Sequence, residues 1–392
     1  MSQAQDQYDA QVRKEIGIFK DWVNVHNLPD IAHYWADGKI RPKQEALGYS
    51  SAYDMFKQYL ERQCLREPGR SLRFVSIGSG NCDIEIEFAR HLMSAGHSNF
   101  VMECLDLNPA MLDRGREAAR QSGVSAQISF VQGDFNRWQP DQEYDAVLAV
   151  QSLHHVVNLE GLFKQIRASL RPHGRFIITD MIGRNGHQRW PEALEIVNEF
   201  WRELPPAHRY NRMLQRHDEE FVNWDCSIEG FEGIRSQDIL PLLLSHFHFE
   251  LFMAYGNVID PFVDRAFGHN FDPAVAWDRD FIDRVHQRDE EAMLSGLIKP
   301  VHMDAVVGKE PMERVLCHKP FTPEFSVRWP DPLPPVADPE EKPRLEREVQ
   351  RLEHDNATLR QKLDLAESQM RMAANSRWLT LGNRLGLGPK LR

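Results

Sequence analysis

The stretch Phe74-Val75-Ser76-Ile77-Gly78-Ser79-Gly80-Asn81-Cys82-Asp83 decides the fold of this chain. Its first half is apolar and β-branched, which is typical of a buried strand, and residues 84–92 continue with apolar side chains at helical spacing. Gly78 and Gly80 permit backbone conformations that a Cβ would block, and they let a ligand approach the main chain. A strand, a tight glycine turn and a helix N-terminus together predict a nucleotide-binding corner.

The alternation of strand and helix continues through residues 73–182. We predict strands at 73–77, 100–105, 128–132, 146–150 and 175–181, and helices at 83–95, 109–121 and 159–170. Strands that alternate with helices predict an α/β fold around a mostly parallel sheet with right-handed crossovers. Ligands of such sheets bind outside the carboxyl ends of the strands, so this edge is where functional residues are expected.

The segments that flank this core indicate how the rest of the chain is organised. Residues 1–72 are expected to form a helical N-terminal cap, with a polar connection at 33–43 between its helices. Packing against the sheet is the expected role of the cap, and covering a bound ligand with Tyr34, Trp35 or Arg41 is the alternative. Within a globular domain at 73–319, residues 183–301 predict inserts over the pocket mouth. These include helices at 236–245 and 279–295, and strands at 247–255 and 303–307 that could close the sheet.

The C-terminal part has a different composition. Residues 320–343 are rich in proline and predict an extended linker. Residues 344–375 follow a heptad pattern with leucine at d and Asn356 at an a position, which favours a parallel homodimer through 345–373. A single amphipathic helix lying on its own domain is the alternative. The basic tail at 376–392 could make weak contact with an anionic membrane surface or a partner, although its glycines favour a frayed terminus.

Composition narrows the classes of partner. The net charge of −11 argues against nucleic-acid binding. The five cysteines include no CxxC pair and there is no apolar leader, so we expect a cytoplasmic protein, with a peripheral position at the inner membrane face through the tail as a variant. No metal is expected, because His208, His217 and Asp218 lack convincing ligand spacing.

Further motifs narrow the kind of nucleotide. A dinucleotide fingerprint needs a third glycine at the position that Asp83 holds, which weakens an interpretation as an NAD enzyme. Asp106 ends the second predicted strand, where a carboxylate can accept both ribose hydroxyls, and we prefer it to Glu103 because it lies just before the Asn108-Pro109 turn. At the end of the third strand, Asp134 can accept from an adenine amine and Phe135 can lie against the ring.

In this order the motifs resemble those of class I methyltransferases that depend on S-adenosylmethionine (SAM). The resemblance covers about residues 73–182 and rests on 77–80, 106–112, 133–134, 145–155 and 170–175. It implies a Rossmann-like, doubly wound sheet of seven strands, with SAM as the methyl donor. The cofactor-binding residues that it implies are Gly78, Ser79, Gly80, Asp106, Leu107, Asp134, Phe135 and Gln151. Cys82 departs from the pattern, because many relatives have a third glycine there.

Candidate catalytic residues follow the fourth and fifth strands. The sulfonium of SAM is already reactive, so such a protein mainly aligns the acceptor, but a hydroxyl acceptor also gains from a general base. His154 and His155 follow the fourth strand, and we expect only one of them to face the pocket because neighbours on an extended chain point in opposite directions. Asp180 ends the fifth strand and is the third candidate.

The acceptor is less clearly indicated. Four residues of the inserts could bind an anionic or sugar-like acceptor, with a surface salt bridge or structural contact as the alternative for each: Arg209, Tyr210, Arg235 and Arg265. The linker, coiled coil and basic tail are similar to the architecture of bacterial surface-polysaccharide methyltransferases, which implies methylation of an oxygen on a glycan or lipid-linked sugar. A diffusible small metabolite is the nearest alternative acceptor. A non-catalytic module that keeps the SAM fold for assembly is the alternative from another class.

Overall fold

The computed structural model describes residues 3–19, 28–228, 230–329, 360 and 362–363. The chain divides into two units, Met1–Arg328 and Trp329–Arg392, and the central sheet with its covering helices belongs to the first unit. The coiled-coil, homodimer and tail predictions fall almost entirely outside the described residues. Among those residues, no helix is both long and apolar enough to cross a membrane.

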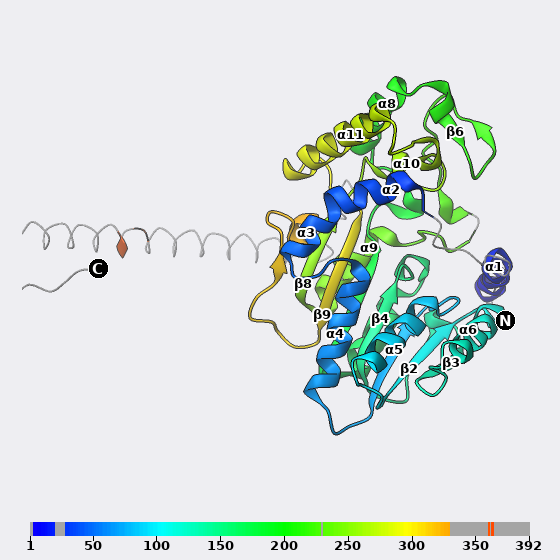
Figure 1. Ribbon diagram of the computed structural model, residues 1–392, viewed down its shortest axis with the longest axis vertical. Helices are drawn as coiled ribbons and strands as arrows, with labels where there is room; N and C mark the ends of the chain where they lie inside the picture. The colour runs from blue at the N-terminus through cyan, green and yellow to red at the C-terminus, as the bar shows by residue number, and fades with distance from the viewer. Residues whose placement is uncertain (1–2, 20–27, 229, 330–359, 361, 364–392) are drawn as a thin grey trace, which may run out of the picture. The chain divides into compact units, whose positions relative to one another are not determined.

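A mostly parallel sheet forms the centre of the first unit (Figure 1). Its strands, in the order in which they lie side by side, are β10 (Leu316–Cys317), β8 (His248–Tyr255), β9 (His302–Gly308), β5 (Leu170–Met181), β4 (Tyr144–Val150), β1 (Leu72–Ile77), β2 (Phe100–Asp106) and β3 (Ile128–Gln132). Only β9 runs antiparallel to its neighbours. The predicted α/β fold is confirmed, but the sheet has eight strands instead of seven, because the two-residue strand β10 pairs with β8.

Helices cover both faces of the sheet, as the apolar strands require. One face packs against α4 (Ala52–Arg66), α5 (Asp83–Ser94) and α6 (Pro109–Gln121), and the other packs against α7 (Leu159–Ser169) and α9 (Ser236–His246). Neighbouring strand residues enter opposite cores: Phe74 belongs to the first and Val75 to the second. Burial on both faces explains why these strands are nearly continuous apolar runs in the sequence.

The N-terminal cap is helical, as predicted, but its expected polar connection is helical too. It contains α1 (Gln3–Phe19), α2 (Asp30–Trp35), a π-helical turn at Ala36–Ile40 and α3 (Arg41–Ala46). Pro42 does not break the chain of helices because it lies in the first turn of α3, where its missing N–H has no helical partner to lose. Tyr34 donates to Asp283 and Trp35 donates to His286 of α11 (Ala276–Leu294), so both side chains pack within the cap and inserts.

The inserts follow β5, and the domain ends later than predicted. They contain α8 (Pro191–Glu203), the hairpin of β6 (Tyr210–Asn211) and β7 (Arg216–His217), and α10 (Asp260–Val263). The sequence predicts a linker from Pro320, but α12 (Pro323–Ser326) follows, and Phe321 and Val327 are buried in the two cores. The sequence does not reveal this short helix, because the segment is rich in proline and only a few apolar residues anchor it to the cores.

Candidate active site

The glycine turn lies between β1 and α5, and it is closely packed. Gly78 and Gly80 both have positive φ values, +68° and +55°. A Cβ on Gly78 would come within 2.8 Å of Cβ of Ser152, a residue that follows β4 and donates from Oγ to the Ile77 carbonyl at 2.6 Å. The turn is therefore held against the carboxyl end of the neighbouring strand, where a ligand of this sheet is expected.

Asp106, at the end of β2, contacts the same turn. Its Oδ2 accepts the Gly80 N–H at 2.8 Å, and its Oδ1 accepts the Asn108 N–H at 2.8 Å. Burial raises the pKa of Asp106, and the two backbone hydrogen bonds oppose that rise. The carboxylate retains further lone pairs, so it can accept ribose hydroxyls from the position predicted for the ribose-binding acid.

Asp134, the predicted adenine-binding acid, is contacted by a residue that the sequence did not single out. The hydroxyl of Tyr8, from α1, donates to Oδ1 and Oδ2 of Asp134 at 3.0 and 2.8 Å. Burial and then this hydrogen bond raise the pKa of Tyr8. Phe135 is buried beneath the site, and its ring is near the position that a Cβ on Gly78 would take.

Other predicted cofactor residues also lie at this edge. Ser79 and Leu107 are half-buried and belong to the turns after β1 and β2. Gln151 follows β4 with a φ of +52°, an uncommon backbone conformation for a residue other than glycine, and donates its N–H to the Thr179 carbonyl. The paired registers of β1, β2, β3 and β4 bring all of these turns to one edge of the sheet.

His154 and His155 both turn toward one carboxylate, contrary to the expectation that only one would face the pocket. Residues 153–155 form a 3₁₀ turn instead of an extended strand, so the two imidazoles lie on the same side, with ring centroids 4.4 Å apart. The Nε2 atom of His154 lies 3.5 Å from Glu232 Oε1, and that of His155 lies 3.4 Å from Glu232 Oε2. Glu232 could not be identified from the sequence, because it lies in a turn far along the chain that only the tertiary fold brings next to the two histidines.

Each imidazole also forms a hydrogen bond from its Nδ1 atom to a second carboxylate. His154 donates from Nδ1 to Asp180 at 2.7 Å, and His155 donates from Nδ1 to Glu15 of α1 at 2.9 Å. A third imidazole, that of His187, places Nε2 2.7 Å from Glu232 Oε1. The turn at Asn185–His187 that carries it has positive φ values at Gly186 and His187, a signal of constraint that the sequence alone does not reveal.

The charges of this cluster are unusual. Burial alone would lower the pKa of His154, but Asp180 and then Glu232 raise it to about 10. Burial would raise the pKa of Glu232, but the neighbouring imidazoles of His154 and His187 hold it far below its ordinary value. The two carboxylates thus favour the protonated form of His154.

Asp180 is buried next to His154. Its oxygens accept from three backbone N–H groups, those of Ser152, Leu153 and Met181, in addition to His154. Its side chain has no exposed surface. The geometry therefore makes Asp180 a positioning residue for His154, while the two histidines remain the groups that can face an acceptor.

The four acceptor residues predicted in the inserts have contacts within the protein. Arg235 pairs with Glu160 at 2.6 Å and with Asp238 at 2.8 Å, between α7 and α9. Arg209 donates to the carbonyls of Glu219 and Arg202, and the Tyr210 ring lies 5.0 Å from that of His217 in the small hairpin. Arg265 follows α10. Their role in acceptor binding stays a prediction.

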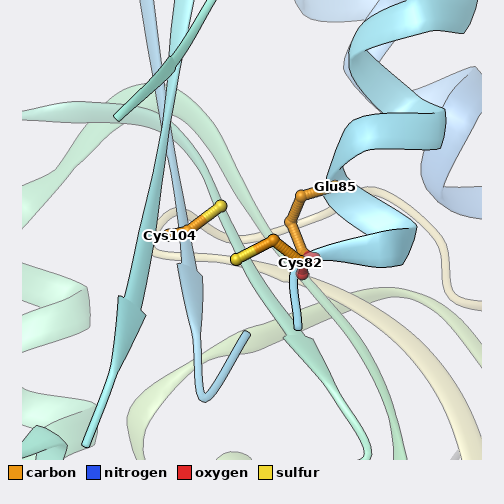
Figure 2. Close-up of side chains that lie close together, drawn as sticks. All are labelled: Cys82, Glu85 and Cys104. Atoms are coloured by element: carbon orange, nitrogen blue, oxygen red, sulfur yellow. The ribbon is translucent and has the colours of Figure 1, made fainter. Parts of the chain in front are cut away.

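Cys82, which departs from the glycine pattern, belongs to a buried group under the turn. Figure 2 shows the thiols of Cys82 and Cys104 close together beside Glu85 at the start of α5. Cys82 has a φ of +60°, so it adopts the backbone conformation for which glycine is usual. Glu85 accepts from Ser76 Oγ at 2.6 Å, and burial raises its pKa to about 7. The small thiol lets the turn form without the third glycine.

Comparison with known proteins agrees with the site. Residues 74–174 match the family described as a methyltransferase domain. This segment is a class I, SAM-dependent methyltransferase domain. Over 121 residues, the chain is 32% identical to sterol 24-C-methyltransferase erg6 of Aspergillus fumigatus, a match that covers 31% of this chain and 30% of that protein. The chain spans less than a third of the length of the sterol methyltransferases that it matches.

Two further matches extend beyond this segment. The chain is 29% identical to the ubiquinone/menaquinone biosynthesis C-methyltransferase UbiE of Rhodopseudomonas palustris over 186 residues, which covers 42% of this chain and 72% of the relative. Among solved structures, it is similar to the O-methyltransferase of a trans-AT PKS multienzyme of Brevibacillus brevis in complex with S-adenosyl-L-homocysteine. That match has a TM-score of 0.35 and 14% identity, over 67% of this chain and 80% of the other.

Proposed function

We propose that the protein transfers the methyl group of SAM to an oxygen of a small-molecule acceptor. The observation that carries this proposal is the alignment of the glycine turn, Asp106 and Asp134 along one edge of the sheet, with the His154–His155 pair after the next strand. The glycine turn, Asp106 and Asp134 suit binding of SAM, the methyl donor. We expect the acceptor to approach the methyl group of SAM from the side of the two histidines.

The oxygen assignment rests on the polar character of the acceptor side. A hydroxyl acceptor must lose a proton near the moment of attack, and a cluster of imidazoles and carboxylates can stabilise or remove that proton. Three imidazoles, those of His154, His155 and His187, lie around the carboxylate of Glu232. An acceptor that has a free lone pair and no proton to lose, such as a thioether, would not need such a cluster.

We propose a small-molecule acceptor in place of the glycan acceptor that the C-terminal architecture implied. The relatives are named for sterol and for ubiquinone/menaquinone methylation, both on small molecules. The glycan interpretation depended on the linker, the coiled coil and the tail, which lie mostly outside the described residues. Because those relatives are C-methyltransferases by name, a carbon next to a hydroxyl is the second candidate for the methylated atom.

Binding and transfer should be measured separately. Calorimetry with SAM on the full chain tests the donor site, and release of S-adenosylhomocysteine with a panel of phenols, quinols, sterols and hydroxy acids tests transfer. We expect SAM binding and turnover with at least one hydroxylated acceptor, whose product mass spectrum locates the methyl group. Absence of binding at millimolar SAM would refute the proposal, whereas binding without turnover on the whole panel would favour a non-catalytic module.

A further inference from the structure

The cluster around Glu232 has the form of a metal site. Three ligand atoms, His154 Nε2, His155 Nε2 and a Glu232 oxygen, lie within 4.8 Å of one another. A four-coordinate cation bound at 2.0–2.2 Å needs its donors roughly 3.4 Å apart. The Nε2 atoms of His154 and His155 lie 3.5 and 3.4 Å from Oε1 and Oε2 of Glu232, respectively, so each imidazole has one carboxylate oxygen at about that spacing. These contacts are also long for hydrogen bonds.

The partners behind the three groups strengthen this interpretation. A histidine that binds a metal through one ring nitrogen almost always donates its other N–H to a carboxylate, a carbonyl or water, which fixes the ring orientation. In this cluster Asp180 accepts from His154 Nδ1, and Glu15 accepts from His155 Nδ1. His187 lies 2.7 Å from Glu232 Oε1 and so holds the carboxylate. Each of the three groups thus has its own orienting partner.

We propose that His154, His155 and Glu232 bind one divalent transition-metal cation, which takes the place of the proton on Nε2 of His154. Two imidazoles and one carboxylate are a ligand set that Zn²⁺ accepts in catalytic sites, with a fourth position left open for water or substrate. The side chain of Glu232 is 39% exposed, whereas those of His154 and His155 are 6% and 16% exposed, so a cation could reach the cluster from the side of Glu232. The sequence did not suggest this site because its carboxylate comes from the turn before α9 and its supporting acid comes from α1.

The buried group at Cys82, Glu85 and Cys104 fits a cation less well. Its three side chains are nearly inaccessible, and it lacks comparable support, since Glu85 is already engaged by Ser76. The histidine cluster, by contrast, includes a partly exposed carboxylate, that of Glu232.

The role of the cation follows if the proposed function holds. A cation at this position would bind the acceptor oxygen and lower the pKa of its hydroxyl, so that the proton leaves to water before the methyl group moves. The oxygen lone pair then forms the bond to the methyl carbon, and the carbon–sulfur bond breaks with its electron pair going to the sulfonium sulfur. The acceptor class would be molecules with a hydroxyl that a cation can coordinate.

Zinc titration of the tag-free, metal-stripped full chain tests the site without SAM. We expect saturable binding of one Zn²⁺ per chain. Glu232→Gln and His155→Gln should each weaken it at least about tenfold, and Glu15→Gln about 10–100-fold through loss of orientation. His208→Gln, which breaks a similar histidine–carboxylate pair with Asp278 at 2.9 Å elsewhere in the chain, should change the affinity less than twofold. Thermal melting establishes that each variant is folded.

A spectrum of the unaltered protein avoids any doubt about folding. X-ray absorption of the zinc-loaded chain should show two imidazoles in the coordination shell. Absence of saturable binding, equal affinities in all variants, or a shell with thiolate ligands would overturn the proposal. Because no SAM is present, these results stand apart from the methyl-transfer assay: a chain that transfers methyl groups but binds no zinc refutes the site alone.

Discussion

The Nδ1 atom of His154 lies 2.7 Å from Oδ1 of Asp180, a carboxylate with no exposed side-chain surface. The same carboxylate fixes the 3₁₀ turn of residues 153–155 through the N–H groups of Ser152 and Leu153. One buried acid thus sets both the backbone turn and the direction of the imidazole that the turn carries.

Asp180→Asn should damage both properties. Each of the two carboxylate oxygens of Asp180 accepts from two N–H groups. In asparagine an NH₂ group replaces one of these oxygens, so two N–H groups lose their acceptor. We expect the free energy of unfolding to fall by about 3 kcal/mol in urea titrations, and methyl transfer to fall about 10–100-fold at temperatures where the variant is folded. Asp278→Asn, at the His208 pair, is the matched control and should cost stability without a specific loss of transfer.

Asp106→Ala should weaken SAM binding at least about tenfold in calorimetry, because hydrogen bonds to a charged group are worth about 1.5–3 kcal/mol. Glu103 of the same strand is the control. It accepts from Tyr144 and Gln142, so Glu103→Gln should leave the SAM affinity within twofold of the original value. The reverse result would show that Glu103 is the ribose-binding acid.

The two turn glycines should differ in their tolerance of alanine. Both have positive φ, so Gly80→Ala should cost about 1–2 kcal/mol of unfolding free energy. Its added methyl would meet only the flexible end of Met111 at 3.4 Å, whereas that of Gly78 would meet Cβ of Ser152 at 2.8 Å. Gly78→Ala should therefore cost at least about 1 kcal/mol more. Equal losses in denaturant titrations would mean that the turn is less tightly packed than the structure has it.

Tyr8→Phe should raise the affinity for SAM about 3–10-fold. The tyrosine hydroxyl donates to the oxygens of Asp134 and so competes with the adenine amine for their lone pairs, and the phenylalanine ring keeps the packing against Phe231. Calorimetry at several temperatures measures the change. A weaker affinity would instead indicate that the hydroxyl contacts the cofactor directly.

Glu85→Gln should flatten the dependence of stability on pH. Burial raises the pKa of Glu85 to about 7 in the folded protein, from 4.5 in its ordinary state. An acid whose folded pKa is raised contributes its full stability below about pH 4.5, and that stability is lost as the pH rises toward and through 7. Between pH 5 and pH 8, the original protein should lose on the order of 1–3 kcal/mol relative to Glu85→Gln. Urea titrations at both pH values give this difference, and parallel curves would contradict it.

Much of the fold could be predicted from sequence because its determinants are local. Apolar strands, helical periodicity and the Gly78–Gly80 turn lie in consecutive residues, and the strands and helices of 73–182 formed close to the predicted bounds. The connection at 33–43 was missed because a π-helical turn joins α2 directly to α3, and no simple sequence pattern indicates such a turn.

The candidate site was predictable only on its donor side. Asp106 and Asp134 follow strands directly, so the order of motifs places them. Glu232, His187 and Glu15 come from a turn, a constrained loop and the first helix, and only tertiary packing brings them to His154 and His155. The sequence signal of His187 and Glu232 is limited to the glycines beside them, Gly186 and Gly233, whose turns pair through the Gly186 N–H and the Gly233 carbonyl.

Helix α1 contacts both halves of the site: Tyr8 binds Asp134, and Glu15 accepts from both His155 and the N–H of Phe231. Thermodynamic linkage gives this shared support a consequence. If SAM changes how firmly α1 is held, then it changes the affinity for a ligand at the histidine cluster, and that ligand must change the affinity for SAM by the same factor. Through α1, binding of SAM and binding of the acceptor would then be coupled, and each could be measured through its effect on the affinity for the other.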